Sequence, residues 1–304
     1  MKLLAILLNP AIFALVALVA SVVWMLKDEK DKSRPLVVFA LVLNLIYPWL
    51  LSVVLGGEAG LLPWKYDHML FRLDASLGVS AASIALPLQG ALRIPLLVVY
   101  KVILPIMVLW LLLLRSPNRR GAFVIAYVTE MIAGPIVYAI VPACGPIYAF
   151  GAQWLHPPAV QANLIYLIGI MNAFPSLHIA TAFILVLFAP GKLWRGVSLV
   201  YLAGTVLATL STGEHYFIDL IPGLAFGCFA TSMGYSKFRS ALVYLGIVLA
   251  WSCAVRFGYL ILIAHSGLLR TFAALTVALA GIALLKEWRI PAMSPSVPSI
   301  APQE

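Results

Sequence analysis

Two short polar stretches of this sequence stand directly in front of apolar runs. The first reads NAFPSLHIATAF (residues 172–183) and contains Ser176 and His178. The second reads STGEHYFIDLIPG (residues 211–223) and contains His215 and Asp219. Serine, histidine and aspartate are the residue types that carry acid–base and nucleophilic chemistry. We therefore ask what reaction these side chains could support together.

His215 and Asp219 are four residues apart at the predicted start of a helix, so their side chains share one helix face. The carboxylate can then hold the imidazole in one tautomer. A neutral imidazole nitrogen becomes a competent nucleophile when the other ring nitrogen donates a hydrogen bond. A simple ion pair at a helix end is the alternative for this spacing, and it stays open at this point.

The PSLH segment offers what such a nucleophile needs. Pro175 and Ser176 are typical of a helix start, where unpaired backbone N–H groups and the helix dipole favour a bound phosphate. His178 lies in the first turn, and an imidazole with an ordinary pKa of about 6.5 can give a proton to a departing oxygen. Together the two stretches indicate phosphoryl transfer through a phosphohistidine.

The composition places both stretches in a membrane protein. Of 304 residues, 63% are hydrophobic and only 10% are charged, whereas a water-facing surface needs about a quarter of its residues charged. A helix needs about 20 mostly apolar residues to cross the hydrocarbon. We expect an all-α, polytopic transmembrane helix bundle with about nine spans and a core of about six. The expected spans lie near residues 3–26, 36–56, 94–114, 121–141, 177–190, 196–213, 218–234, 241–264 and 268–286.

The chain divides where its composition changes. The segment from 61 to 93 mixes apolar and charged residues, as in DHMLFRLDASLGV, which favours a position along the outer membrane interface. The last residues, PAMSPSVPSIAPQE, have the proline- and serine-rich composition of a disordered tail. The expected parts are N-terminal transmembrane helices (1–60), the amphipathic outer-face segment (61–93), a helical core that holds both polar stretches (94–235), C-terminal transmembrane helices (236–290) and the tail (291–304).

Lysine and arginine between the spans indicate the orientation, because short cytoplasmic connections retain positive charge. Most of them fall on one side, in the connections that contain residues 27–34, 115–120, 192–195, 237–239 and 286–289. We expect this side to be cytoplasmic, with the amino terminus outside and the carboxyl terminus inside. Both polar stretches then face the outer side of a cell membrane, whether periplasmic, extracellular or lumenal.

At these residues the chain resembles the type 2 phosphatidic acid phosphatase superfamily, which also includes vanadium haloperoxidases. FPSLH is similar to the second motif of that superfamily, P-S-G-H, and HYFID is similar to the third, S-R-x5-H-x3-D. The resemblance implies the helical architecture of that superfamily, with His215 as nucleophile, Asp219 as its orienting partner, His178 as general acid and Ser176 as a phosphate ligand. It covers roughly residues 65–235.

Three basic positions of the superfamily motifs are filled differently here. When the first motif, K-x6-R-P, is aligned on Pro146, Tyr138 stands in place of its lysine and Gly145 in place of its arginine. Thr209 stands in place of the arginine of the third motif. This pattern resembles the branch that contains the aureobasidin-sensitive inositol phosphorylceramide synthases, in which PSLH replaces PSGH. Members of that branch move a phosphorylated headgroup from one lipid to another.

Phosphoryl transfer builds up negative charge that a cationic group must meet. We expect Arg256, which interrupts an apolar span near its outer end, and Arg72 of the amphipathic segment to bind substrate. Ser176 and Tyr216 complete the predicted substrate-binding set. Snorkelling of the long side chain to the headgroup region is the alternative for Arg256.

The remaining titratable residues point to no further chemistry. Lys101 and Glu130 lie inside neighbouring predicted spans and are expected to neutralise each other. The three cysteines are too few and too scattered for a disulfide framework or a metal site. No cofactor or metal is expected, because histidine supplies both the nucleophile and the acid.

The sequence thus predicts an integral membrane phosphotransferase that moves a phosphorylated headgroup, such as phosphoinositol, between lipids through a phosphohistidine. A lipid phosphate or pyrophosphate phosphatase is the alternative, because attack by water instead of an alcohol gives hydrolysis. An inactive lipid-binding relative and a transporter also stay open. The expected partners are a phospholipid or lipid-phosphate substrate and membrane lipids, and nucleic acid is not expected. Donor, acceptor and oligomeric state do not follow from the sequence.

Overall fold

The computed structural model describes residues 37–40, 42–43, 46–47, 65–88, 90–155 and 170–289 of the chain. The predicted span at 3–26, most of the predicted span at 36–56 and the predicted tail at 291–304 lie outside these ranges.

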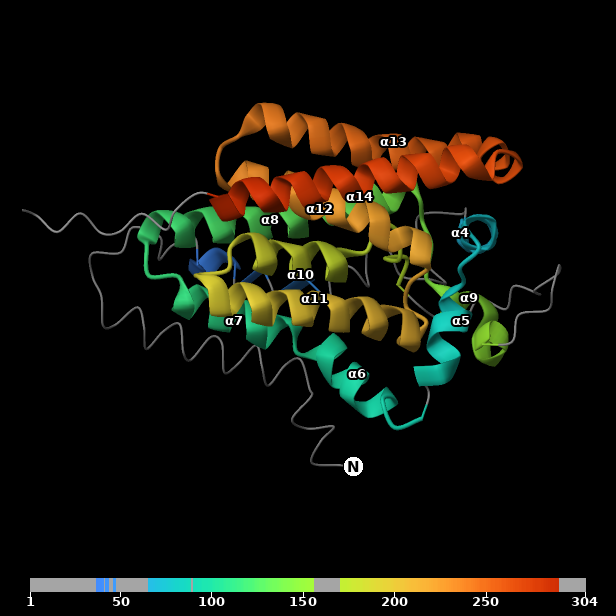
Figure 1. Ribbon diagram of the computed structural model, residues 1–304, viewed down its shortest axis with the longest axis horizontal. Coiled ribbons are helices and arrows are strands. Elements are labelled where there is room, and N and C mark those ends of the chain that lie inside the picture. Colours follow the sequence, from blue (N-terminus) through green and yellow to red (C-terminus); the bar gives the residue numbers. More distant parts are fainter. Residues whose placement is uncertain are drawn as a thin grey trace, which may run out of the picture.

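A bundle of roughly parallel and antiparallel helices forms the body of the protein (Figure 1). No β-strand occurs in the described ranges, so the predicted all-α polytopic bundle is confirmed. Five described helices are long and apolar enough to cross a membrane, or up to seven if each of two bent pairs is one span. The total of about nine includes segments outside the described ranges and stays a prediction. The lengthwise helices are α7 (Ile103–Leu113), α8 (Pro117–Ile140), α10 (Leu177–Leu187), α11 (Lys192–Thr212), α12 (Phe217–Gly234), α13 (Phe238–Ala264) and α14 (Ser266–Arg289).

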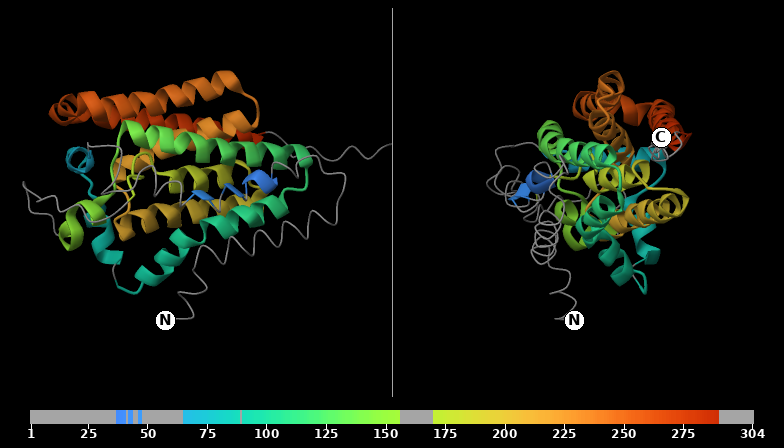
Figure 2. Two further views of the ribbon diagram at one scale, coloured as in Figure 1. Left: turned by 180° about the vertical axis from the view of Figure 1, so that it is seen from behind. Right: turned by 90° about the vertical axis from the view of Figure 1, so that its left-hand side faces the viewer.

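Short helices gather at one end of this bundle, on the right in Figure 1 and on the left in the first view of Figure 2. At this end α8 and α11 finish, and α10 and α12 begin. The predicted amphipathic segment lies here as two helices bent by 69°. The predicted span at 94–114 is also bent, by 54°, between α6 (Arg93–Lys101) and α7. The short elements at the end are α4 (Asp67–Leu77), α5 (Ala81–Ala85), η1 (Leu86–Leu88), α9 (Pro146–Phe150) and η2 (Gly151–Leu155).

Helix α12 lies at the centre, and 83% of its span is buried inside the protein. Its glycines allow the backbone of α10 to approach closely. A methyl group at Gly223 would lie 2.7 Å from the carbonyl oxygen of Ser176, and one at Gly227 would lie 2.9 Å from that of Ala180. Small residues four apart on one face are how helices pack tightly in membranes. The two glycines therefore set where the first turn of α10 lies against α12.

The basic turns gather at the opposite end of the bundle. Arg119 donates to the carbonyl of Phe188 at the end of α10, over 3.2 Å. Arg195 donates to the carbonyl of Trp288 at the end of α14, over 3.3 Å, and Lys237 pairs with Glu287. These contacts join the connections that contain most of the lysine and arginine, so the bundle has one basic end and one end with the two polar stretches.

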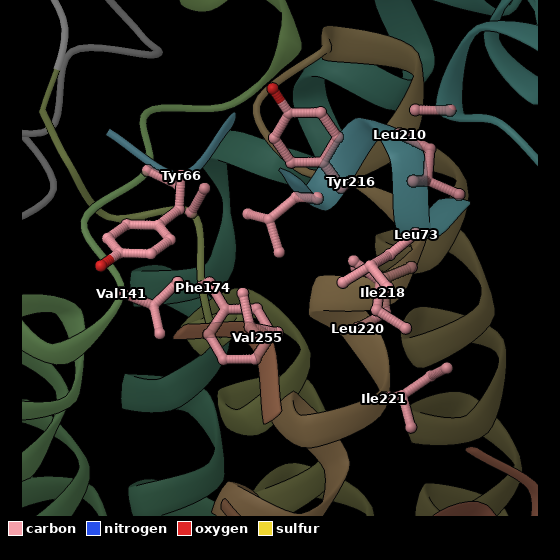
Figure 3. Packing of buried hydrophobic residues seen from close by; sticks show 14 of the residues in the cluster. Tyr66, Leu73, Val141, Phe174, Leu210, Tyr216, Ile218, Leu220, Ile221 and Val255 are labelled. Carbon is pink, nitrogen blue, oxygen red and sulfur yellow. The ribbon is translucent and has the colours of Figure 1, made fainter. Parts of the chain in front are cut away.

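An apolar cluster surrounds the start of α12 and anchors the end helices (Figure 3). Leu73 of α4, Leu210 of α11, Ile218 of α12 and Val255 of α13 belong to it, together with Val141 just after α8. Leu73 is fully buried, and burying a leucine side chain contributes about 1.5–3 kcal/mol where the alternative is water. Helix α4 is thus part of the core at this end of the bundle.

Candidate active site

His215 lies in the short connection between α11 and α12 and is almost completely buried. Gly213 ends α11 in the left-handed conformation, with φ of 73°, which turns the chain back toward the bundle. The Nδ1 atom of His215 lies 2.8 Å from the carbonyl oxygen of Ala173 and 3.6 Å from Oδ2 of Asp219. A carbonyl only accepts, so Nδ1 carries the hydrogen and Nε2 keeps a free lone pair.

The surroundings keep the His215 ring neutral. Its pKa is lowered to about 4, chiefly because burial disfavours the imidazolium form. The Glu214 carboxylate and the hydrogen bond to Ala173 act in the opposite direction and raise the pKa less than burial lowers it. At neutral pH the ring is therefore in the form that a nitrogen nucleophile requires.

His178 lies in the first turn of α10 and its ring faces that of His215. The ring centroids are 5.8 Å apart, and the planes are inclined by 68°. The ring of Tyr100, in α6, stacks on His178 at 4.1 Å. The Nζ atom of Lys101 lies 5.3 Å from the centre of the Tyr100 ring. An imidazole from the connection before α12 and one from α10 thus meet, and an aromatic ring holds the second of them in place.

Ser176 occupies the cap position of α10, as the sequence indicated. Its hydroxyl oxygen accepts from the backbone N–H of Ile179 over 3.4 Å. Its own N–H donates to the carbonyl of Asp219 over 3.1 Å, which ties the start of α10 to the first turn of α12. The N–H groups of the first turn of a helix have no partner within it and can bind an anion. The start of α10, beside both histidines, is therefore placed to receive a phosphate.

Asp219 is fully buried below His215. Its Oδ2 accepts from the backbone N–H of Tyr216 over 2.8 Å, and its Oδ1 has no hydrogen-bond partner in the part of the chain that the structure describes. The carboxylate caps α12 and faces the His215 ring at 3.6 Å. The shorter contact of that ring is with the carbonyl of Ala173, a partner that the sequence did not indicate.

Two of the other predicted substrate-binding residues, Tyr216 and Arg256, have hydrogen-bond partners within the protein. The hydroxyl of Tyr216 donates to Oδ1 of Asp67 over 3.0 Å. Arg256 donates to the carbonyl of Ile140 over 2.7 Å, at the end of α8. Arg72 is exposed on α4. The structure thus brings together His178, His215, Asp219 and Ser176, whereas Tyr216 and Arg256 make hydrogen bonds within the protein.

Tyr138, Gly145 and Thr209 stand where the superfamily motifs have basic residues. The fold explains directly why position 145 has no basic side chain. Gly145 has φ of 88°, and a methyl group on it would lie 2.2 Å from the carbonyl oxygen of Glu214. No side chain fits there without moving the connection that holds His215. Tyr138 is buried, and the hydroxyl of Thr209 donates to the carbonyl of Val206 over 3.0 Å.

Two aspartates of α4 also reach this site, and neither was among the predicted site residues. Asp67 accepts from the backbone N–H groups of Cys144 and Gly145, and Asp74 accepts from those of Phe217 and Ile218. Both carboxylates are buried. Their spacing was the available signal, because residues seven apart share a helix face, and here that face also contains the buried Leu70.

Lys101 and Glu130 do not form the expected pair. Oε1 of Glu130 accepts from the hydroxyl of Thr181 over 2.6 Å, whereas Lys101 is exposed beside Tyr100. The predicted pair does not form because Lys101 stays on the exposed surface while Glu130 is buried against Thr181.

Comparison with known families matches the model described as the PAP2 superfamily to residues 68–233. This range is more than half of the chain and runs from α4 to α12. The chain belongs to the PAP2 superfamily. Members of this superfamily are generally phosphatases or phosphotransferases. The long apolar helices make the protein a multi-pass membrane protein. No curated protein and no solved structure gave a significant match.

Proposed function

We propose that this PAP2 superfamily protein is a phosphotransferase that moves a phosphorylated headgroup from one lipid to another through a phosphohistidine on His215. The observation that carries the proposal is the pair of imidazoles 5.8 Å apart, with Nδ1 of His215 held by a carbonyl. One ring presents a free nitrogen lone pair. The other lies where a leaving group would depart.

In the first step Nε2 of His215 attacks the phosphorus atom of the donor lipid. A P–N bond forms, the P–O bond to the lipid alcohol breaks, and His178 gives its proton to the departing oxygen. In the second step the hydroxyl of an acceptor lipid attacks the same phosphorus atom. A new P–O bond forms, the P–N bond breaks, and His178 takes the proton of the hydroxyl. Both residues are then in their starting states.

The charges around the site favour a phosphodiester donor. A phosphomonoester carries a charge of about −1.5 to −2 at pH 7, and the superfamily's basic residues would normally meet it. Here the position of Gly145 has no room for a side chain. The carboxylate of Glu214 accepts from the hydroxyl of Tyr148 over 3.1 Å, and its negative charge raises the pKa of the neighbouring His215. A carboxylate in this place repels a dianion more than a monoanion. A diester donor leaves the headgroup attached to the phosphohistidine, as transfer between lipids requires.

The outer face of the membrane is the proposed location of the chemistry. The basic connections lie at one end of the bundle and both histidines at the other. Because positive connections normally stay in the cytoplasm, this arrangement supports a histidine end that faces outside. The resemblance to inositol phosphorylceramide synthases supports the same arrangement and makes a phosphoinositol headgroup the first donor to test.

The test is an assay of the purified full chain in nanodiscs with lipids labelled in the headgroup phosphate. Phosphoinositides and lipid phosphates are offered as donors, each with and without ceramide or diacylglycerol. We expect a labelled lipid product that forms only when an acceptor alcohol is present. Release of free phosphate at the same rate without acceptor would contradict transfer and support hydrolysis.

A transporter is separated from both enzymes by a flux measurement. Labelled substrate is followed across liposomes that contain the wild-type chain or a variant in which His178 and His215 are both replaced by alanine. An enzyme loses product formation in the variant. Flux that needs no acceptor and survives the double replacement would contradict the proposed function.

A further inference from the structure

Helix α4 brings two buried carboxylates to the active-site end of the bundle, and the proposed reaction uses neither of them. Asp67 and Asp74 are seven residues apart, and both are at most 1% exposed. A buried carboxylate is costly unless its oxygens are hydrogen-bonded, and the groups that donate to these two carboxylates lie outside α4. Most of them belong to the two chain segments that enclose the nucleophile, and the backbone of Ala81 adds one more hydrogen bond to Asp74.

Asp74 caps α12 from another helix. Its Oδ2 accepts from the N–H of Phe217 and its Oδ1 from the N–H of Ile218, each over 2.8 Å. These are the first two residues of α12, whose N–H groups have no partner within the helix. The carboxylate also complements the positive end of the helix dipole. It thereby fixes where α12 begins, two residues after His215.

Asp67 holds the other side of the same connection. Its Oδ1 accepts from Gly145 N–H over 2.9 Å and from the hydroxyl of Tyr216 over 3.0 Å, and it also binds Cys144 N–H over 3.1 Å. The carboxylate therefore joins the turn before α9 to the residue that follows His215.

The turn that Asp67 binds packs directly on the nucleophile connection. The N–H of Ile147 donates to the carbonyl of Gly213 over 2.9 Å, and the α-carbon of Gly145 lies against the carbonyl of Glu214. Movement of this turn would displace Gly213 and Glu214, and with them the ring of His215.

We infer that Asp67 and Asp74 are positioning residues that set the place of His215 through the backbone on both sides of it. The inference rests on the proposed phosphohistidine chemistry. Neither carboxylate touches the reacting atoms. Each holds backbone groups within three residues of the nucleophile or in the turn that packs on it, so a loss of either lets His215 shift relative to His178.

The test compares Asp74→Asn and Asp67→Asn with Glu130→Gln in the full chain in nanodiscs. Asparagine keeps one acceptor oxygen, so Asp74→Asn can satisfy only one of the two N–H groups. Glu130→Gln is the matched control, because it removes an equally buried carboxylate that binds Thr181, away from the nucleophile connection. Two quantities are measured: the rate of phosphohistidine formation in a single turnover, and amide hydrogen exchange along the chain.

We expect Asp74→Asn and Asp67→Asn to slow phosphohistidine formation by about 10- to 100-fold, since misplacement by about 1 Å has an effect of this size. KM should change less than about twofold, because substrate contacts are intact. Exchange should rise at residues 217 and 218 in Asp74→Asn and at residues 144 and 145 in Asp67→Asn. Glu130→Gln should match the wild type in rate and in exchange at all four positions.

Tyr216→Phe provides a milder variant that keeps both carboxylates. It removes the hydroxyl that Asp67 binds, and we expect a lower kcat at unchanged KM. A raised KM with wild-type kcat would instead make Tyr216 a substrate contact and overturn this part of the inference.

The outcomes separate the inference from the proposed function. Wild-type rates in both aspartate variants, or unchanged exchange at 217 and 218 in Asp74→Asn, would overturn the positioning role. If the wild-type chain forms no phosphohistidine with any donor, the proposed function fails. The exchange pattern then still decides whether α4 holds the connection.

Discussion

The proposed chemistry depends on one residue, His215, whose imidazole is buried and neutral. Its pKa is lowered to about 4 by burial, so Nε2 loses its lone pair only when the pH falls through that value. We expect the acid limb that His215 contributes to kcat/KM to lie near pH 4, well below the ordinary histidine value of about 6.5. The measurement is the rate of phosphohistidine formation between pH 3.5 and 8, with protein integrity followed in parallel. An acid limb of His215 near 6.5 would contradict the burial argument.

His178 is assigned the proton transfer to the leaving group, and its variant should show this by leaving-group dependence. We expect His178→Gln to slow transfer from a lipid alcohol donor by about 10²- to 10⁴-fold, the usual contribution of a general acid. A nitrophenol leaving group departs without a proton, so the rate of transfer from such a donor should fall much less in His178→Gln. Equal losses for both donors would assign His178 to binding rather than to proton transfer.

Some parts of this site could be predicted from the sequence and others could not. His178 and His215 stand just before apolar runs, so their positions at helix starts followed from the residue pattern. The role of Ala173 did not, because a backbone carbonyl leaves no mark in the sequence. Asp67 and Asp74 were assigned to an interfacial helix because charged residues of amphipathic helices normally face water. Here they face buried backbone N–H groups instead.

Among the elements, the contact between α10 and α12 sets the distance between the two imidazoles. Gly223 allows α12 to touch the carbonyl of Ser176, two residues before His178. We expect Gly223→Ala to push the start of α10 away and to lower kcat by about 100-fold, the effect of a displacement of about 1 Å. The control is Gly246→Ala in α13, where no atom lies within 4 Å of the added methyl group. Wild-type kcat in Gly223→Ala would show that this contact does not position the site.

The elements themselves were predictable to different degrees. Long apolar runs gave α8, α11, α12, α13 and α14 close to their expected ranges, because hydrocarbon thickness limits the length of a span. The bends within 67–88 and 93–113 were not predicted, since they arise from packing at the end of the bundle. The close approach of α10 to α12 depends on which face the glycines occupy, and this is fixed only by the assembled bundle.

For the whole molecule, the separation of a basic end from a histidine end predicts the sidedness of the protein. Ser266 opens α14 at the histidine end, and Ser240 lies near the start of α13 at the basic end. We expect a membrane-impermeant thiol reagent to label Ser266→Cys in intact cells and Ser240→Cys only after the membrane is opened. The unmodified chain controls for Cys253, which is exposed. The reverse labelling pattern would place the chemistry on the cytoplasmic side.

The large apolar side chains on the outside of the bundle fit a position across a membrane. Phe257 of α13 and Leu275 of α14 are exposed in the isolated chain, and in a membrane such residues contact lipid. The proposed lipid donors and acceptors would then reach the histidine end from within the bilayer, with the headgroup at the level of the start of α10.

The most direct measurement of the central claim is to trap the covalent intermediate. The full chain is incubated briefly with a donor lipid labelled in its phosphate, quenched in alkali, and the labelled peptide is identified by mass spectrometry. We predict an acid-labile, alkali-stable label on His215, absent from His215→Ala, whose turnover should fall by at least about 10³-fold. Label on another residue, or turnover retained in His215→Ala, would contradict the account.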